Sequence, residues 1–534
     1  MVQAAQVNIE RNMSQTEEFV PVWQQYNPES QLPDPVPLAV KGTIPSWVKG
    51  SLYRNGSGVF QIGDSKMKHL FDGMAVLLRF IIENGEVKFQ SKILNSESWE
   101  ACYKANRLVV NQFGTNALPD PCKSIFSRFF SLFTSESPTD NTSVNIIERG
   151  DQLWALTETQ KMNRVDPQTL SKIDQADLGK YVTVHLSTAH PHLEKDGSIY
   201  NLATNFDPKA AYNIVQIPAK SDGDLDFENS KIVASAPSRW KWNISYNHSF
   251  GMSENYFVIL EQPFVYSIGR LIFRKFTNST IEDCLVSYPE EQSVFHIIRK
   301  DGKEINVKYV TDPFFVFHYV NCYEEDGQLV IDLVWYKDVD SVNKLYVESL
   351  QGNAILQLGY APLFARFVVP LDVTKAEVNK NLITLDTKAT AVLQNDGSIF
   401  CTPDLYNKDS DGIIMELPQI NYKTYNGKKY RYIYASPILT KKNRILKVDL
   451  KTRKFIECTD IDVNHLPGEP IFLPKPGSTR EDEGVLLTPI IANKPGTESY
   501  LLILDAETMT ELARATLPAK EIMTLTFHGF FKPM

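Results

Sequence analysis

The sequence predicts an all-β protein with a large closed arrangement of sheets, such as a propeller. Short runs rich in β-branched and aromatic residues recur through most of the 534 residues, and turn-forming pairs separate them. Long helical patterns are few, and strand-like runs do not alternate with helices. Short hairpins sustained over this length favour a closed β structure, although no clean sequence repeat marks its units.

The turn pairs account for the hairpins. Asn-Gly and Asp-Gly pairs suit two-residue hairpins because both central residues need positive φ. Such pairs begin at Asn84, Asp196, Asp301, Asp326, Asp396 and Asn426. The pattern of strand, turn and strand is clearest over residues 294–310, 323–336 and 391–403, and further pairs of outer strands are predicted over 445–458 and 500–517.

Composition and charge narrow the class of protein. The 55 basic and 64 acidic side chains give a net charge of −9, which argues against binding to nucleic acid because that needs a concentrated basic face. The six cysteines have no regular spacing, which indicates reduced thiols in an intracellular protein. No signal peptide is evident, and no apolar run approaches the roughly 20 residues that cross a bilayer. We therefore expect a cytoplasmic protein that does not span a membrane.

Two aromatic segments with basic neighbours interrupt the strand pattern. Residues 120–133, "DPCKSIFSRFFSLF", place five apolar side chains on one helical face, with Lys123 and Arg128 at its flanks. Residues 264–276, "FVYSIGRLIFRKF", are similarly aromatic and carry three basic side chains. These stripes could pack on the protein's own core, but such faces also suit the headgroup region of a membrane. We expect peripheral membrane contact through both, and lipidation of Cys122 is a hypothesis only.

The nine histidines do not form a helical zinc motif, since none pair as HxxxH or HExxH. Three of them, His248, His318 and His528, lie within or at the end of apolar strand-like runs. An imidazole buried there needs a partner, because an unpaired buried polar group costs about 1–3 kcal/mol. A lone histidine is nevertheless more often structural than a ligand, so context alone identifies candidates.

The spacing of the candidates fits successive propeller blades. His190 and His248 are 58 residues apart, His248 and His318 are 70 apart, and His318 and His528 are 210 apart. These intervals are roughly one, one and three blades if a blade takes about 40–70 residues, since known repeats take about 40–50. Innermost strands of different blades face one axis, so the imidazoles could converge there. Spacing does not choose between His190 and His192 as the fourth member.

Three glutamates lie in more apolar contexts than a surface glutamate would. They are Glu158 in "WALTETQ", Glu416 in "IIMELPQINY" and Glu469 in "PGEPIFL". Each could be a solvated charge at a strand end. A histidine ligand, however, needs its second nitrogen held, usually by a carboxylate, to fix the tautomer and orientation of the ring. Taken with the histidines, the three glutamates are candidates for that supporting role.

Many motifs in order resemble the carotenoid cleavage oxygenases. They include "GSLYRNGSGVF", "HLFDGMAVLLRF", "TETQKMNRVDPQTL", "TAHPH", "HSFGM", "ELPQINY", "GEPIF", "EDEGVLLT" and "FHGFF". "LPDPCKSIFSRFF" is similar to the metazoan branch, which includes β-carotene oxygenases, insect isomerooxygenases and the retinoid isomerohydrolase of the vertebrate eye. The resemblance covers about residue 37 to the C-terminus. It implies an N-terminal extension over 1–36 and a single propeller domain over 37–534.

The resemblance implies a fold and a metal site. The family fold is a seven-bladed β-propeller with a helical and loop cap over its top face, and Fe(II) on the axis. Matched motif by motif, the iron ligands are His190, His248, His318 and His528. The supporting carboxylates are Glu158, Glu416 and Glu469, which by analogy orient His248, His318 and His528. The residues that line or border the substrate tunnel are Phe71, Phe113, Thr157 and Phe527. The segment 120–133 matches the membrane-docking patch at the tunnel mouth.

The resemblance also implies a reaction, and two alternative functions stand beside it. The leading hypothesis is an Fe(II)-dependent dioxygenase that uses O₂ to split a conjugated double bond of a carotenoid or apocarotenoid into carbonyl products, with or without isomerisation. The alternatives are a retinyl-ester isomerohydrolase of the same fold and a non-catalytic carotenoid-binding protein. In "VTVHLSTAHPH", His185 and Leu186 depart from the usual family pattern and could reshape the pocket. A membrane-docked homodimer would fit the exposed aromatic stripes.

Overall fold

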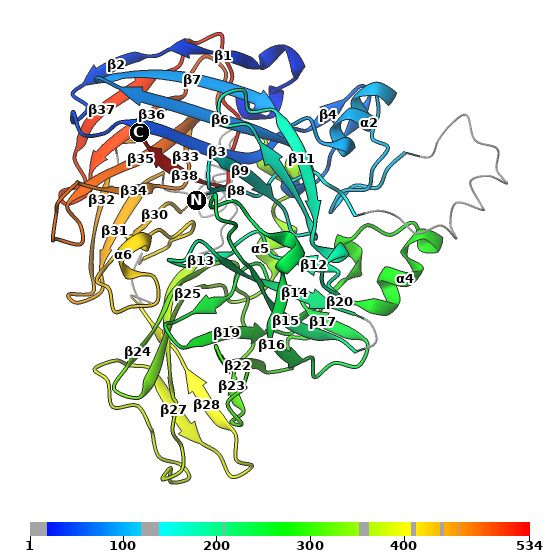
Figure 1. Ribbon diagram of the computed structural model, residues 1–534, viewed down its shortest axis with the longest axis vertical. Helices are drawn as coiled ribbons and strands as arrows, with labels where there is room; N and C mark the ends of the chain where they lie inside the picture. The colour runs from blue at the N-terminus through cyan, green and yellow to red at the C-terminus, as the bar shows by residue number, and fades with distance from the viewer. Residues whose placement is uncertain are drawn as a thin grey trace, which may run out of the picture.

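The computed structural model describes residues 19–118, 138–206, 209–351, 362–406, 413–437, 443–458 and 460–534. Over these residues the chain is a seven-bladed β-propeller, with the sheets arranged around a common centre (Figure 1). The predicted all-β class is confirmed. The segment 120–133, with Cys122, lies outside the described residues.

The first two blades show how local sequence makes the strands. Blade I has the order β1-β7-β6-β3-β38 and blade II the order β11-β10-β9-β8. Almost the whole of β6 is buried, and its alternate side chains belong to two different hydrophobic clusters. The bounds are β1 (Leu32–Pro37), β3 (Gly50–Val59), β6 (Met74–Glu83), β7 (Glu86–Ile93), β38 (His528–Pro533), β8 (Asn145–Arg149), β9 (Gln152–Leu156), β10 (Lys161–Val165) and β11 (Lys172–Asp177).

Blades III and IV follow along the chain. Blade IV is bent. Strand β20 follows β19 along the chain and β22 follows β21, and since β19 pairs with β22 and β20 pairs with β21, the two pairing groups form one blade. The bounds of blade III are β12 (Leu186–Ser187), β13 (His192–Leu193), β14 (Ile199–Asn205), β15 (Ala211–Ile217) and β16 (Lys231–Pro237). Those of blade IV are β17 (Asn243–Ser245), β18 (Gly251–Met252), β19 (Tyr256–Glu261), β20 (Phe264–Ser267), β21 (Leu285–Ser287), β22 (Ser293–Arg299) and β23 (Tyr309–Thr311).

Blades V to VII complete the ring. Blade V carries an additional hairpin, β27–β28, whose strand β28 pairs in parallel with β23 of blade IV. The bounds of blade V and this hairpin are β24 (Tyr319–Glu325), β25 (Gln328–Trp335), β26 (Leu363–Pro370), β27 (Thr390–Leu393), β28 (Ile399–Thr402) and β29 (Asp404–Leu405). Blade VI has β30 (Tyr432–Ala435), β31 (Ile445–Asp449) and β32 (Lys454–Cys458). Blade VII has β33 (His465–Pro467), β34 (Ile471–Pro474), β35 (Gly484–Ala492), β36 (Tyr500–Asp505), β37 (Glu511–Thr516) and β2 (Ala39–Gly42).

The two ends of the chain close the ring together. The C-terminal strand β38 is the innermost strand of blade I, where it pairs with β3. The N-terminal strand β2 is the outermost strand of blade VII, where it pairs with β37. Figure 1 shows this exchange as blue and red strands side by side. Each end therefore completes a blade built mainly by the other end.

Most predicted turns lie where expected, with one exception. Asn84–Gly85 has φ of 54° and 81° and Asp326–Gly327 has 49° and 71°, the pattern of a two-residue hairpin with both central residues left-handed. At Asp196 and Asp396 only the glycine has positive φ, and the aspartate side chain accepts the N–H of the serine two residues on. Asn426 instead ends the short helix α6, because the preceding tyrosine-rich turn closes helical hydrogen bonds before the pair is reached.

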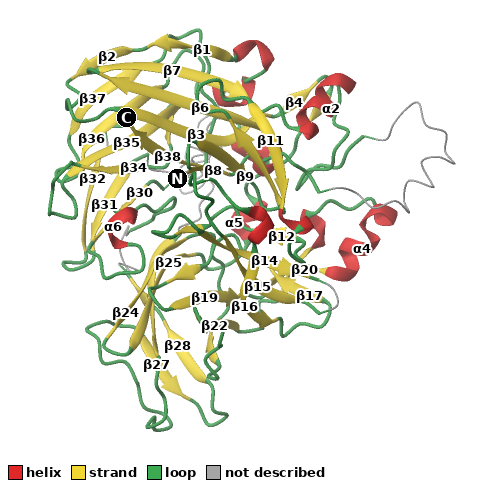
Figure 2. Cartoon of the chain, viewed as in Figure 1, coloured by secondary structure: helices red, strands yellow, loops and turns green. Residues whose placement is uncertain are grey.

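Helices are few and lie outside the sheets. They are α2 (Glu97–Ala105), α4 (Ile268–Thr277), α5 (Asp340–Asn343) and α6 (Tyr422–Tyr425), joined by the short η1 (Val22–Gln25), η2 (Pro28–Ser30), η3 (Leu70–Asp72), η4 (Leu178–Lys180), η5 (Phe227–Asn229), η6 (Glu282–Cys284) and η7 (Val347–Leu350), while β4 (Gln61–Ile62) and β5 (Ser65–Lys66) form a small hairpin. In Figure 2, α2 and α4 lie at the right edge of the propeller, and α5 lies nearer the middle of the view. None of the described helices has the length and apolar character of a membrane span.

The expected boundary at residue 37 stays a prediction, and the described residues before it pack on the propeller. The Trp23 side chain is fully buried among core residues of blades I and VII. Its indole Nε1 donates to Asn493 Oδ1 at 3.1 Å, and its ring lies edge-on to Phe60 at 5.6 Å. The five described cysteines form no disulfide.

Candidate metal centre

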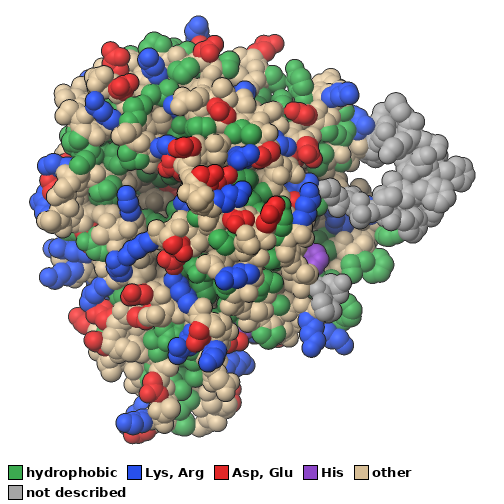
Figure 3. Space-filling view, in the orientation of Figure 1, with side chains coloured by type: hydrophobic (Ala, Val, Ile, Leu, Met, Phe, Trp, Pro, Cys, Tyr) green, Lys and Arg blue, Asp and Glu red, His purple; other side chains and the backbone are tan. Residues whose placement is uncertain are grey.

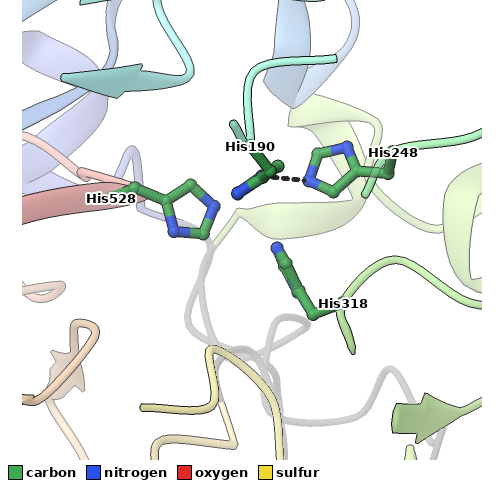
Figure 4. A group of neighbouring side chains, drawn as sticks. All are labelled: His190, His248, His318 and His528. Atoms are coloured by element: carbon green, nitrogen blue, oxygen red, sulfur yellow. Dashed lines mark hydrogen bonds between the residues drawn. The ribbon is translucent and has the colours of Figure 1, made fainter. Parts of the chain in front are cut away.

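Four histidines from four blades meet at the propeller centre. His190 lies between β12 and β13, His248 between β17 and β18, His318 directly before β24, and His528 at the start of β38. These are the innermost strands of their blades, and β38 contacts the inner strands β8 and β34. Figure 4 shows the four rings directed at a common point. The intervals of one, one and three blades predicted from the sequence therefore hold.

The donor atoms are arranged as a metal site would need. The four nitrogen atoms all lie within 4.8 Å of one another. The Nε2 atoms of His190 and His248 are 2.9 Å apart, and the buried Nε2 of His318 has no hydrogen-bond partner among the described residues. A buried nitrogen left without a partner is costly, and a cation held by the four converging nitrogens would satisfy it.

A glutamate holds the far nitrogen of three of these rings. His248 Nδ1 lies 2.5 Å from Glu158 Oε1, and His318 Nδ1 lies 2.6 Å from Glu416 Oε2. His528 Nδ1 lies 2.9 Å from Glu469 Oε1. A carboxylate accepts only, so each Nδ1 carries a proton, and in the neutral ring the Nε2 lone pair then faces the centre. The predicted pairings are the ones that the structure brings together.

Each glutamate is itself held by donors that the sequence argument did not identify. The Tyr246 hydroxyl donates to Glu158 at 2.9 Å, and the Tyr336 hydroxyl donates to Glu416. These tyrosines lie on strands or strand ends with no motif to mark them. Only their position opposite a buried carboxylate reveals the role.

Glu469 has the most extensive support. Arg54, in β3, donates to Oε2 at 2.5 Å, and Gln419 donates to Oε1 at 2.8 Å. The Arg54 side chain is fully buried and Glu469 nearly so. Burial alone would raise the pKa of Glu469, but His528 and Arg54 lower it to about 2. The carboxylate is therefore ionised at neutral pH and remains an acceptor.

Burial keeps two of the imidazoles neutral. It lowers the pKa of His528 to about 4, even though Glu469 acts in the opposite direction. It also lowers the pKa of His190 well below the usual value, and the other three rings lower it further. A neutral imidazole has the lone pair that a metal requires, whereas an imidazolium has none.

A partly open cavity is lined by three of the four histidines. About 1240 Å³ of space, part of it open to solvent, is lined by His248, His318 and His528 together with mainly apolar side chains. All four predicted tunnel residues line it: Phe71, Phe113, Thr157 and Phe527. Leu186, one of the residues noted as a departure from the family pattern, lines it as well.

A second, more polar cavity is also lined by His318 and His528. It has about 740 Å³ of space and is lined by His190, Asn321, Gln419 and Glu469 among others. His192 also lies there, but its ring bonds to the Tyr422 hydroxyl at 2.9 Å and to the Phe250 carbonyl at 3.0 Å. His192 is not among the four converging histidines.

Comparisons with known proteins agree with this architecture. A family model described as retinal pigment epithelial membrane protein matches residues 26–533. The β,β-carotene 15,15′-dioxygenase of Gallus gallus is 41% identical over 519 residues, covering 94% of this chain and 96% of the relative. The enzyme of the same name from Homo sapiens is 40% identical over 524 residues, covering 95% and 93%.

Solved structures show the same fold at lower identity. The crystal structure of an ACO/RPE65 chimera superposes with a TM-score of 0.75 at 22% identity, covering 96% of this chain and 98% of the other. Cobalt-substituted Synechocystis ACO superposes with a TM-score of 0.74 at 23% identity, covering 96% and 100%. Because the family model matches residues 26–533 and two relatives of 40–41% identity are covered over more than nine-tenths of their length, the chain belongs to the retinal pigment epithelial membrane protein family of carotenoid oxygenases.

Proposed function

We propose that this protein is an iron-dependent dioxygenase that cleaves a conjugated double bond of a carotenoid or apocarotenoid into retinal-type carbonyl products. The observation that carries the proposal is a set of four converging imidazole nitrogens, three of whose rings line a mainly apolar cavity. The β-carotene dioxygenases of Gallus gallus and Homo sapiens, each about two-fifths identical to this chain, support the substrate class.

The donor set fits Fe(II), and His190, His248, His318 and His528 would hold it. Imidazole nitrogen suits iron, and bound ferrous iron would supply activation of O₂. The chain's own contribution is to bring four imidazole rings to one point and to hold three of them in fixed orientation. Glu158, Glu416 and Glu469 hold the Nδ1 protons of three rings and so keep each Nε2 lone pair directed at the centre.

The tunnel residues position the substrate and exclude water. Phe71 contacts Phe113, Phe317 and Phe527 edge-on, with ring centroids 5.8, 6.3 and 5.9 Å away. An apolar polyene gains little from hydrogen bonding, so the shape of this aromatic wall decides how far it enters and which double bond lies beside the histidines. Thr157 and Glu158 are polar groups on the same wall, close to the reacting end.

Purified protein incubated with β-carotene, zeaxanthin and a retinyl ester tests the proposal. We expect aldehyde products from a carotenoid in air, resolved by chromatography, and no turnover without O₂. A retinol product formed from the ester under anaerobic conditions would instead support the isomerohydrolase alternative. A cis double bond in an aldehyde product would add isomerisation to cleavage.

Substitution tests the proposed ligands. His318→Ala should lose both bound iron and activity, and Glu416→Gln should lower metal affinity or activity by about 10- to 100-fold. His465→Ala is the matched control, because His465 bonds to the Glu498 carbonyl in blade VII, away from the four rings. Full iron and activity in His318→Ala would contradict the ligand assignment.

We also propose a peripheral membrane site on α4. Ile272, Phe273 and Phe276 are 60%, 60% and 51% exposed, and Figure 3 shows hydrophobic side chains projecting at the position of this helix. The backbone carbonyl of the neighbouring Trp242 accepts the N–H of Ile268, and the Trp242 side chain, 63% exposed, extends the patch. Aromatic and aliphatic side chains exposed together suit the boundary between headgroups and acyl chains. Cytoplasmic location, the docking role of 120–133 and a homodimer remain predictions from the sequence.

A further inference from the structure

His69 is a buried histidine outside the group of four. Its side chain is fully buried. Nδ1 accepts a hydrogen bond from the Phe71 N–H at 3.2 Å, and Nε2 lies 3.1 Å from the Val342 carbonyl oxygen. Because Nδ1 is an acceptor, the proton must be on Nε2, which donates to Val342. A single neutral tautomer satisfies both contacts, and burial favours it by lowering the pKa of His69.

Asp72 fixes the same corner of the tunnel wall. Its carboxylate accepts the N–H of His69 at 2.9 Å, the N–H of Gly114 at 2.7 Å and the Thr115 hydroxyl at 2.6 Å. His69 and Asp72 thus form a reciprocal cap around η3, which carries Phe71. The cap also ties η3 to the loop that carries Phe113.

A third segment is joined at this corner through the backbone. The Leu70 N–H donates to the Leu345 carbonyl at 2.8 Å, and the Val347 N–H donates to the Lys68 carbonyl at 2.7 Å. Leu345 lines the tunnel, as do Leu70 and Phe71. Three stretches of chain far apart in sequence therefore form one wall, and His69 bonds or packs against all of them.

The rings held in this way are those beside the reacting end. The His69 ring centroid lies 4.9 Å from Phe71 and 5.0 Å from Phe113. Phe71 in turn contacts Phe527, the residue before one of the four converging histidines. A change at His69 can therefore move the aromatic wall without touching a ligand or its glutamate.

We propose that His69 is a positioning residue that holds Phe71 and Phe113 in the tunnel wall and thereby sets which double bond of the polyene lies beside the four histidines. The inference rests on the carotenoid cleavage proposed above. A hydrocarbon polyene offers no polar group to fix its depth, so a small displacement of these rings changes the bond that is presented.

Two substitutions each keep one of the two hydrogen bonds of the His69 ring and remove the other. His69→Asn retains an acceptor near the position of Nδ1, as an asparagine cap does, and loses the contact to Val342. His69→Gln places an amide donor near the position of Nε2 and loses the cap on Phe71. With β-carotene, we expect His69→Gln to lower the ratio of the main aldehyde to its shifted products by about tenfold, the equivalent of one buried hydrogen bond, and His69→Asn to lower it less. Metal content should stay at the native level in both.

Gly114→Ala is a second variant that leaves His69 in place. A Cβ at Gly114 would lie 2.8 Å from His69 Cβ and 3.1 Å from Glu282 Oε2, so the added methyl must move His69 or the loop that carries Phe113. We expect it to shift the products in the same direction as His69→Gln. This variant keeps the test informative if the loss of the buried imidazole prevents folding.

His296→Gln is the control, since it also removes a mostly buried histidine, one whose ring bonds to carboxylates in blade IV and lies outside the tunnel wall. It should lower stability and leave the product ratio unchanged. Native cleavage with an unaltered ratio in His69→Gln and Gly114→Ala would overturn the positioning role alone. Absence of any aldehyde from the native protein would overturn the proposed function, and the positioning role with it.

Discussion

At the scale of the residue, the centre depends on buried charges that satisfy one another. Glu469 holds His528 and is held by Arg54, and these side chains are buried almost completely. A buried carboxylate is tolerated only when charged and polar partners surround it. The orientation of one imidazole therefore depends on a residue that never contacts the metal position.

Arg54→Met should make this dependence measurable. Removing one partner of a buried ion pair leaves the other uncompensated, so we expect the free energy of unfolding to fall by about 3 kcal/mol and metal affinity to fall with it. Urea denaturation and metal analysis give the two quantities. Arg79→Met is the control, because Arg79 is also buried but bonds to Ser51 and Gln168 rather than to a carboxylate. It should cost stability while leaving metal content unchanged.

The sequence identified the histidines and glutamates but not the groups behind them. The apolar contexts of His248, His318 and His528 and the blade-like spacing made them candidates. The family motifs were needed to assign them as ligands and to prefer His190 over His192. Tyr246, Tyr336 and Arg54 carry no such signal, because each acts through a carboxylate from another blade. Pairing across blades is a property of the fold and leaves no local pattern.

At the scale of the element, the blades differ so much in length that they produce no regular sequence repeat. Blade VI occupies only Tyr432–Cys458, whereas blade V begins at Tyr319 and its last strand ends at Leu405. Additional hairpins and helices lie between strands rather than between blades, as β27–β28 and α4 do. Hairpin chemistry was therefore readable at Asn84 and Asp326, but the number of blades was not.

At this scale, the exposed side chains of helix α4 predict binding to membranes. Phe273→Ser combined with Phe276→Ser should weaken binding to vesicles of phosphatidylcholine and phosphatidylserine at least about tenfold, because burying each phenyl ring contributes about 1.5–3 kcal/mol. Sedimentation with vesicles measures the change. Val463→Ser, which alters a 62% exposed side chain in the loop before blade VII, should bind as the native protein does. Unchanged binding by the double variant would exclude α4 from the docking site.

At the scale of the whole molecule, closure of the ring involves residues before the expected domain start. Trp23 joins Asn493 of blade VII to Phe60 of blade I, and its carbonyl accepts the Thr524 hydroxyl at 3.2 Å. Trp23→Ala should lower the free energy of unfolding by about 3–5 kcal/mol, measured by urea denaturation. Trp242→Ala, which removes an exposed indole, should change it by no more than about 0.5 kcal/mol. Similar values for the two variants would show that the extension is dispensable for the fold.

The interface of blades III and IV should make stability depend on pH. His296 in β22 lies 2.7 Å from Glu304 and 3.5 Å from Glu261, which also accepts the Tyr212 hydroxyl of β15. Burial alone would lower the pKa of His296, but the two carboxylates raise it to about 9 from the usual 6.5. The folded state therefore binds this proton more tightly than the unfolded state.

The sign follows from this difference in affinity. The stabilisation is complete below pH 6.5 and is lost as the pH rises through 9, with a magnitude of the order of 3 kcal/mol. Urea denaturation at pH 6, 7.5 and 9.5 should show a smaller difference in unfolding free energy between the native protein and His296→Gln at each higher pH. Taking that difference removes the contribution of thiols and other groups that titrate in the same range. A constant difference across the series would mean that His296 is neutral in the folded protein and that its carboxylate contacts act as ordinary hydrogen bonds.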